Sequence, residues 1–169
     1  MAKASARPAA TLVATAVGRA LVGPVLVDSG PLLALFNGAD RWHAAVVQWL
    51  RDQPHVRLLT TWPVATEVCA LLARRIHNGA ALDFLRWAES GGIEIDTPHA
   101  TSLTEILRIS ERFADLPFDL ADASIADAAA RLRIRHVLTL DTDFDVYRDK
   151  SGKPLIHVMR GRKAARHPT

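Results

Sequence analysis

Short apolar runs alternate with helical patterns along most of this chain, and this alternation is the feature that most restricts its fold. Residues 25–27 and 136–140 are largely apolar runs that read as short buried strands. Residues 57–61, 93–95 and 155–158 show three further strand patterns. Between them we expect helices over residues 31–36, 64–77, 80–89, 100–113 and 120–132, and one more that Asp40 caps. Such an order predicts a mainly parallel sheet with helices on both faces.

Acidic residues stand where a sheet of this kind would gather them. Asp28 follows the first strand and Asp141 the fourth, while Glu67 and Asp122 lie in helices. Ligands of open α/β sheets bind beyond the carboxyl ends of the strands. Carboxylates gathered there repel one another and raise each other's pKa, so a cation is needed to hold them ionised. Because Mg²⁺ and Mn²⁺ prefer oxygen ligands, the pattern predicts a site for one of these ions.

Each acid taken alone also has a structural explanation. Asp28 can cap a helix, and Glu67 lies near a helix start, where its charge complements the dipole. Asp119 is a better N-cap candidate than Asp122, which lies three residues later on the same helix face. Asp119 and Asp143 are therefore accessory candidates. Three further residues either orient water or phosphate or serve as caps and turns: Ser29, Asn37 and Thr139.

Composition restricts the class of protein. A chain of 169 residues with 49% hydrophobic content fits one globular domain. Its single cysteine, Cys69, lies among apolar residues of a predicted helix and excludes an intrachain disulfide, so we expect a buried thiol and a cytoplasmic protein. No apolar stretch has membrane-spanning length. His43, His77 and the other five histidines lack the close pairing of a zinc helix motif, and we expect these two on helix surfaces.

The net charge of +3 hides a segregation along the chain. Residues 1–27 and 150–169 hold nine Lys and Arg and no acid, which leaves twelve bases against all 18 acids between residues 28 and 149. Either the basic ends hold a polyanionic substrate beside a metal-loaded crevice, or they are solvated tails. We therefore divide the chain into an N-terminal extension (1–23), a domain (24–159) and a basic C-terminal tail (160–169).

Four segments of the chain resemble the PIN-domain nucleases, and in particular the toxin component of VapBC-type toxin–antitoxin pairs. They are Val-Leu-Val-Asp-Ser-Gly-Pro-Leu-Leu at 25–33, Pro-Val-Ala-Thr-Glu-Val at 63–68, Asp-Leu-Ala-Asp-Ala-Ser-Ile-Ala at 119–126 and Leu-Thr-Leu-Asp-Thr-Asp-Phe at 138–144. The resemblance covers roughly residues 25–147, and the order and spacing of all four segments agree with the family. It is much more specific than any single acid.

The resemblance assigns roles to these positions. It implies that Asp28, Glu67, Asp122 and Asp141 are the core catalytic and metal-binding acids, with accessory positions at Asp119 and Asp143. It also implies a three-layer α/β/α sandwich, dependence on Mg²⁺ or Mn²⁺ and endoribonuclease activity, with tRNA or rRNA as candidate substrates. A small protein antitoxin and a homodimer are the partners expected for such a toxin.

Other functions remain open at this point. An aspartyl phosphatase would use a motif like that at residues 141–143 near the start of its domain, whereas here it lies near the end. A receiver domain needs a well-placed late lysine, but Lys150 is the first lysine after Lys3. A catalytically silent module that binds RNA or protein is the main alternative. Such a module is expected to lack one core acid, and none is missing here.

Overall fold

Five parallel strands form the central sheet of the computed structural model, which describes residues 21–115, 117, 119–141, 143–148 and 152–162, and only the backbone of Asp143. The strands follow the order β3-β2-β1-β4-β5, and every neighbouring pair is parallel. Their bounds are β1 Pro24–Val27, β2 Arg57–Thr61, β3 Glu94–Asp96, β4 His136–Leu138 and β5 Ile156–His157. The predicted parallel sheet is confirmed.

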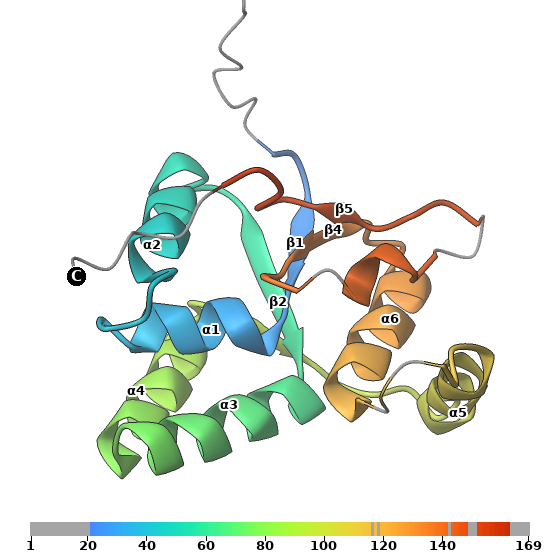
Figure 1. Ribbon diagram of the computed structural model, residues 1–169, viewed down its shortest axis with the longest axis horizontal. Coiled ribbons are helices and arrows are strands. Elements are labelled where there is room, and N and C mark those ends of the chain that lie inside the picture. Colours follow the sequence, from blue (N-terminus) through green and yellow to red (C-terminus); the bar gives the residue numbers. More distant parts are fainter. Residues whose placement is uncertain (1–20, 116, 118, 142, 149–151, 163–169) are drawn as a thin grey trace, which may run out of the picture.

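Helices cover the sheet on both sides. They are α1 Ser29–Phe36, α2 His43–Asp52, α3 Trp62–Arg75, α4 Asn78–Glu89, α5 Ser102–Arg112 and α6 Leu120–Leu132, with a 3-10 turn η1 at Asp143–Asp145. Figure 1 shows α1 to α4 on one side of the sheet and α5 and α6 on the other. The predicted three-layer α/β/α sandwich is therefore confirmed.

The strand order creates a switch point between β1 and β4. The chain first moves outward from β1 to β2 and β3, and then returns to the other side of β1 to form β4. Because right-handed crossovers are strongly favoured, the reversal of direction moves the connecting helices to the opposite face. The carboxyl ends of β1 and β4 thus lie side by side where helices diverge, which is the usual ligand position in such sheets.

The core is built on the central strands and on the small residues of α6. Val25, Leu26 and Val27 of β1 are almost fully buried, as a central parallel strand requires. Along α6 the buried positions are mostly alanines, which lets this helix pack closely on β1, β2 and α3. Since α6 begins next to the carboxyl ends of these strands, the packing also sets where its first-turn acids lie.

Two helix starts differ from the prediction. Ser29 was expected to cap the first helix, but Ser29 is its first residue and Asp28 is the cap, because the Asp28 carboxylate accepts a hydrogen bond from the Ser29 backbone N–H at 2.6 Å. Asp40 accepts a hydrogen bond from the Trp42 N–H at 2.7 Å, so it caps the turn before α2 rather than the helix itself.

The boundary between α3 and α4 also differs. The Thr61 hydroxyl accepts from the Val64 N–H, so α3 begins at Trp62 and not at Val64. His77 was expected at the end of this helix. It instead caps the next one, because its Nδ1 accepts a hydrogen bond from the Ala80 N–H at 3.1 Å, and α4 then starts at Asn78, where we had expected a stop.

Several smaller expectations can be compared with the structure. The fourth strand ends at Leu138, two residues earlier than predicted, since the Thr139 side chain takes over the hydrogen bonding there. Cys69 is half-buried. His43 lies in α2 and hydrogen-bonds through Nδ1 to the Ala34 carbonyl. Most of the N-terminal extension and residues 163–169 of the basic tail lie outside the described residues. Of the helices described, none has the length and apolar character needed to cross a membrane.

Candidate metal centre and active site

Asp28 is the most constrained of the predicted acids. It follows β1 and caps α1, and its side chain is buried, with 6% of its surface exposed. Its backbone N–H donates to the Leu138 carbonyl at 3.0 Å, which extends the β1–β4 pairing by one residue. The chain therefore places this carboxylate at the switch point between β1 and β4.

Thr139 connects the ends of the two strands. Its hydroxyl donates to Asp28 Oδ2 at 3.0 Å and accepts from the Asp141 backbone N–H, also at 3.0 Å. Thr139 itself is 3% exposed, so water does not compete freely for these bonds. One buried hydroxyl thus sets the position of Asp28 relative to the backbone of Asp141.

The surroundings of Asp28 raise its pKa from 3.8 to about 6. Burial is the largest cause, because it disfavours the charged form. Hydrogen bonds from the Ser29 N–H and the Thr139 hydroxyl lower the pKa, while the nearby negative charges of Glu67 and Asp119 raise it again. The carboxylates of α3 and α6 are therefore close enough to Asp28 to act on it electrostatically.

The other predicted acids lie in α3, at the start of α6 and just after β4. Glu67 is half-buried in α3. Asp119 caps α6 by accepting from the N–H groups of Ala121 and Asp122, at 2.7 and 3.2 Å. Asp122 is half-buried in the first turn of α6, and Asp141 is exposed just after β4. The side chain of Asp143 lies outside the described residues.

A pair of buried hydroxyl groups links two of the elements that carry the acids, and the sequence analysis did not identify it. Thr61 at the end of β2 and Ser124 of α6 share a hydrogen bond of 2.6 Å between their side-chain oxygens. Ser124 also donates to the Ala121 carbonyl at 2.7 Å. This contact ties the start of α3, which carries Glu67, to the start of α6. The sequence signal for this contact was a polar residue at the end of a buried strand, Thr61, and another inside an alanine-rich helix, Ser124.

The donor set fits a hard divalent cation by its chemistry. Glu67 and Asp119 both raise the pKa of Asp28, and none of the three carboxylates forms an ion pair with a basic side chain of the described residues. Carboxylate oxygens without a cationic partner are the ligands that Mg²⁺ and Mn²⁺ prefer. Within the part of the chain that the structure describes, however, no three His, Cys, Asp or Glu side chains are already placed around one metal position.

Hollows open beside several of the acids. One of about 330 Å³ is lined by Trp42, Thr139 and Asp141, and another of about 440 Å³ by Asp119. A larger cavity of about 890 Å³ lies at the start of β2, near Trp62, and none of the predicted acids lines it. Of the predicted acids, Asp141 and Asp119 therefore adjoin surface hollows.

Comparison with known proteins agrees with this geometry. The model of the PIN domain family matches residues 25–150, which contain all of the predicted acids. Ribonuclease VapC26 of Mycobacterium tuberculosis is 32% identical over 117 residues, which cover 69% of this chain and 86% of that protein.

Two solved structures share the fold. One is VapC20 of Mycobacterium tuberculosis, described as a Sarcin-Ricin loop cleaving toxin, with a TM-score of 0.66 and 20% identity over 70% of this chain and 91% of that one. The other is VapBC2 from Rickettsia felis, bound to a DNA fragment from their promoter, with a TM-score of 0.55 and 14% identity over 73% and 92% of the two chains. The parallel sheet, the acids at its switch point and these matches together show that the chain belongs to the PIN-domain family, as a VapC-like member.

Proposed function

We propose that this protein is a metal-dependent endoribonuclease that hydrolyses RNA phosphodiester bonds, and that it is the toxin of a toxin–antitoxin pair. The observation that carries the proposal is the buried carboxylate of Asp28 at the β1–β4 switch point, with two further carboxylates acting on it and no described basic partner. The name of the relative, Ribonuclease VapC26, supports the reaction class. A ribonuclease acting on cellular RNA would work in the cytoplasm.

The proposed ligands follow from position. Asp28 and Asp141 stand at the ends of adjacent strands and are proposed to bind the ion directly. Glu67 of α3 and Asp122 of α6 are proposed to bind the same ion directly or through water. Asp119, which caps α6, is proposed as an accessory ligand. Asp143 is accessory by its place in the sequence motif.

The residues of the chain prepare this site for phosphodiester hydrolysis. When bound, Mg²⁺ or Mn²⁺ supplies Lewis acidity, which activates water and neutralises a phosphoryl oxygen. Thr139 holds Asp28 Oδ2 by a donated hydrogen bond, which orients the carboxylate and favours its ionised form. Ser29 holds Oδ1 through its backbone N–H. Asp28 is thus fixed at both oxygens before any substrate arrives, and preorganisation of this kind lowers the reorganisation needed during catalysis.

The partner and the rival function can be addressed together. The structure of VapBC2 from Rickettsia felis is that of a two-component assembly, which supports a small protein antitoxin as the partner of this chain. A homodimer and a tRNA or rRNA substrate remain parts of the proposal. A silent binding module is disfavoured because all four core acidic positions, Asp28, Glu67, Asp122 and Asp141, hold acids.

A cleavage assay tests the enzyme. Purified protein stripped of metal with EDTA should leave a structured RNA intact, and added Mn²⁺ or Mg²⁺ should restore cutting. Asp28→Asn should abolish cutting, whereas Asp83→Asn, an exposed carboxylate of α4 paired with Arg86, should not. Equal cutting by the Asp28 variant would refute the assignment of the site and point to a contaminating nuclease.

A growth assay tests the toxin. Induced expression in bacteria should arrest growth, and Asp122→Asn should relieve the arrest at equal protein levels. Normal growth with intact soluble protein, combined with no cleavage in the assay above, would favour the binding module.

A further inference from the structure

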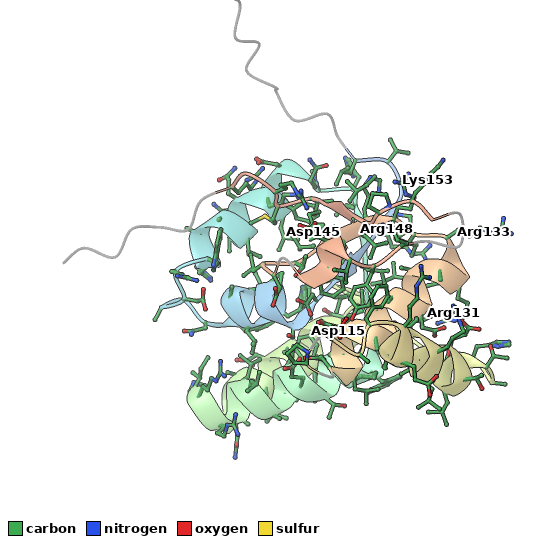
Figure 2. The ribbon with its side chains drawn as sticks, turned by 45° about the vertical axis from the view of Figure 1, so that its right-hand side comes forward. Asp115, Arg131, Arg133, Asp145, Arg148 and Lys153 are labelled. Atoms are coloured by element: carbon green, nitrogen blue, oxygen red, sulfur yellow. The ribbon has the colours of Figure 1, made fainter. Side chains whose placement is uncertain are left out.

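A basic pocket lies between α5, α6 and the segment after η1. It has a volume of about 370 Å³, and three arginines line it: Arg108 and Arg112 from α5, and Arg148. Glu105 is the one carboxylate among its described lining residues. In Figure 2, the labelled Arg148 lies next to the labelled Asp145, whose backbone carbonyl accepts a hydrogen bond from it. The described lining of the pocket thus holds three basic groups and one carboxylate.

The three guanidinium groups differ in their partners. Arg108 is paired with Glu105, with 2.9 Å between NH2 and Oε2. Arg112 lies over the ring of Phe113 at 5.5 Å, and Arg148 donates from NH1 to the backbone carbonyls of Asp145 and Tyr147. Neither Arg112 nor Arg148 forms an ion pair with a carboxylate of the described residues. Within the described residues, a bound anion would therefore be the first negatively charged partner of these two guanidinium groups.

The basic pocket continues into the hollow that contains Asp119. Ala126 and Ala130 of α6 line the pocket, and Ala123 and Asp119 line the adjoining hollow of about 440 Å³. These four positions are spaced four, three and four residues apart, so they form one stripe along the helix. The separation of seven positions between Asp119 and Ala126 corresponds to roughly 10 Å along the helix axis. The pocket therefore lies within a short reach of the acidic crevice.

Two aromatic rings lie at the junction of the two hollows. Phe113 and Tyr147 line both, and they contact each other edge to face with their ring centroids 5.3 Å apart. Phe113 is half-buried and Tyr147 is buried, so their contact fixes the wall from which Arg112 and Arg148 extend. The arginines are adjacent in sequence to these rings, and the path from Asp119 to the basic pocket is built into the packing of α5 on α6.

We propose that Arg112 and Arg148, assisted by Arg108, bind a backbone phosphate of the RNA strand next to the bond that is cut. The inference rests on the proposed function. An acidic crevice repels a polyanion, so much of the affinity for RNA has to come from basic groups outside it. Guanidinium groups suit this role because they bind phosphate through two parallel hydrogen bonds. The continuity of the pocket with the Asp119 hollow favours an RNA strand over an acidic protein segment.

Binding measured without cleavage is the first test. In the inactive Asp28→Asn protein, the affinity for a single-stranded RNA oligonucleotide is measured by fluorescence anisotropy over a range of salt concentrations. Adding Arg112→Gln and Arg148→Gln should weaken binding by about tenfold or more, as loss of hydrogen bonds to a charged group implies. The slope of log Kd against log salt should fall by about 0.7 for each lost phosphate contact.

Cleavage kinetics and a matched control complete the test. In the active protein, the Arg112→Gln and Arg148→Gln changes should raise KM for RNA and leave kcat nearly unchanged, because neither residue belongs to the acidic site. Arg108→Gln should show a smaller effect in the same direction. Arg86→Gln is the control for Arg108→Gln. Arg86 of α4 forms an ion pair with Asp83, which lies three residues earlier, at the same distance of 2.9 Å as the Arg108–Glu105 pair, and both arginines are exposed.

The outcomes separate this inference from the proposed function. Unchanged affinity and salt slope in the Arg112 and Arg148 variants would overturn the phosphate site and leave the pocket to an acidic protein segment. The phosphate site would also be overturned if Arg86→Gln weakened RNA binding as much as the Arg112 and Arg148 variants do. If the parent protein does not cleave RNA but the arginine variants lose RNA binding, the phosphate site stands and the catalytic proposal fails. The single variant Arg112→Gln, whose side chain makes no described hydrogen bond, guards against loss of folding.

Discussion

Asp28 should destabilise the metal-free protein, and replacing it with asparagine should therefore stabilise it. Its pKa of about 6 in the folded protein compares with 3.8 for an ordinary aspartate, a difference of about two pH units. At about 1.4 kcal/mol per unit, ionising Asp28 in the fold at neutral pH costs on the order of 3 kcal/mol relative to the unfolded chain. Asparagine keeps the shape and the acceptor for the Ser29 N–H, but carries no charge.

The sign of the pH dependence follows from the raised pKa. Between pH 3.8 and about 6 the folded protein holds a proton at Asp28 that the unfolded chain has already lost. The contribution of this group to stability therefore falls as pH rises through that window, and is constant on either side of it. The gain from Asp28→Asn should be near zero at pH 4 and complete at pH 7.5.

Thermal unfolding in EDTA measures this effect. For a domain of this size, 1 kcal/mol shifts Tm by roughly 2–4 °C, so Asp28→Asn should raise Tm by about 6–12 °C at pH 7.5. Asp83→Asn is the control, since that carboxylate is exposed in a surface pair worth at most about 1 kcal/mol. A lower Tm for Asp28→Asn at pH 7.5, or a shift of equal size at pH 4, would refute this reasoning. It would show that Asp28 acts as a helix cap and that its charge does not destabilise the metal-free protein.

Three further outcomes are expected. Mn²⁺ at about 100 times its dissociation constant should stabilise the parent by roughly 2.7 kcal/mol, and a thermal shift assay should show most of this effect lost in Asp28→Asn; an undiminished shift would place the ion elsewhere. Thr139→Val removes a hydrogen bond that lowers the pKa of Asp28, so the acidic limb of the pH profile of kcat/KM should move up by about one pH unit. Thr139→Ser keeps the hydroxyl and should restore the original profile. An acidic limb that does not move in Thr139→Val would contradict this role. Ser124→Ala should cost about 1–3 kcal/mol in urea unfolding and be non-additive with Thr61→Val, because each hydroxyl is the buried partner of the other; strict additivity would show the contact to be incidental.

Local sequence patterns were sufficient for the architecture. Apolar runs of strand length, helical spacing and turn residues predicted the alternating elements, and the strands that follow from them form one parallel sheet. The position of Asp28 at a strand end followed from the same pattern, because the acid directly follows the apolar run. The errors concerned helix starts, the end of the fourth strand and the burial of Cys69. At Asp28 and His77 a side chain accepted a backbone N–H that several neighbouring residues were equally able to bind.

What surrounds the acids was decided by the tertiary structure. Thr139 meets Asp28 across 111 residues of sequence, and Thr61 meets Ser124 across 63. The pocket of Arg112 and Arg148 likewise joins two elements that are distant along the chain. Periodicity reports which face of a strand or helix is buried, but not which element lies against it. Hydrogen bonds and pKa shifts depend on distances of a few ångströms between such elements, and these are set only once the strand order and the packing of α5 and α6 are complete.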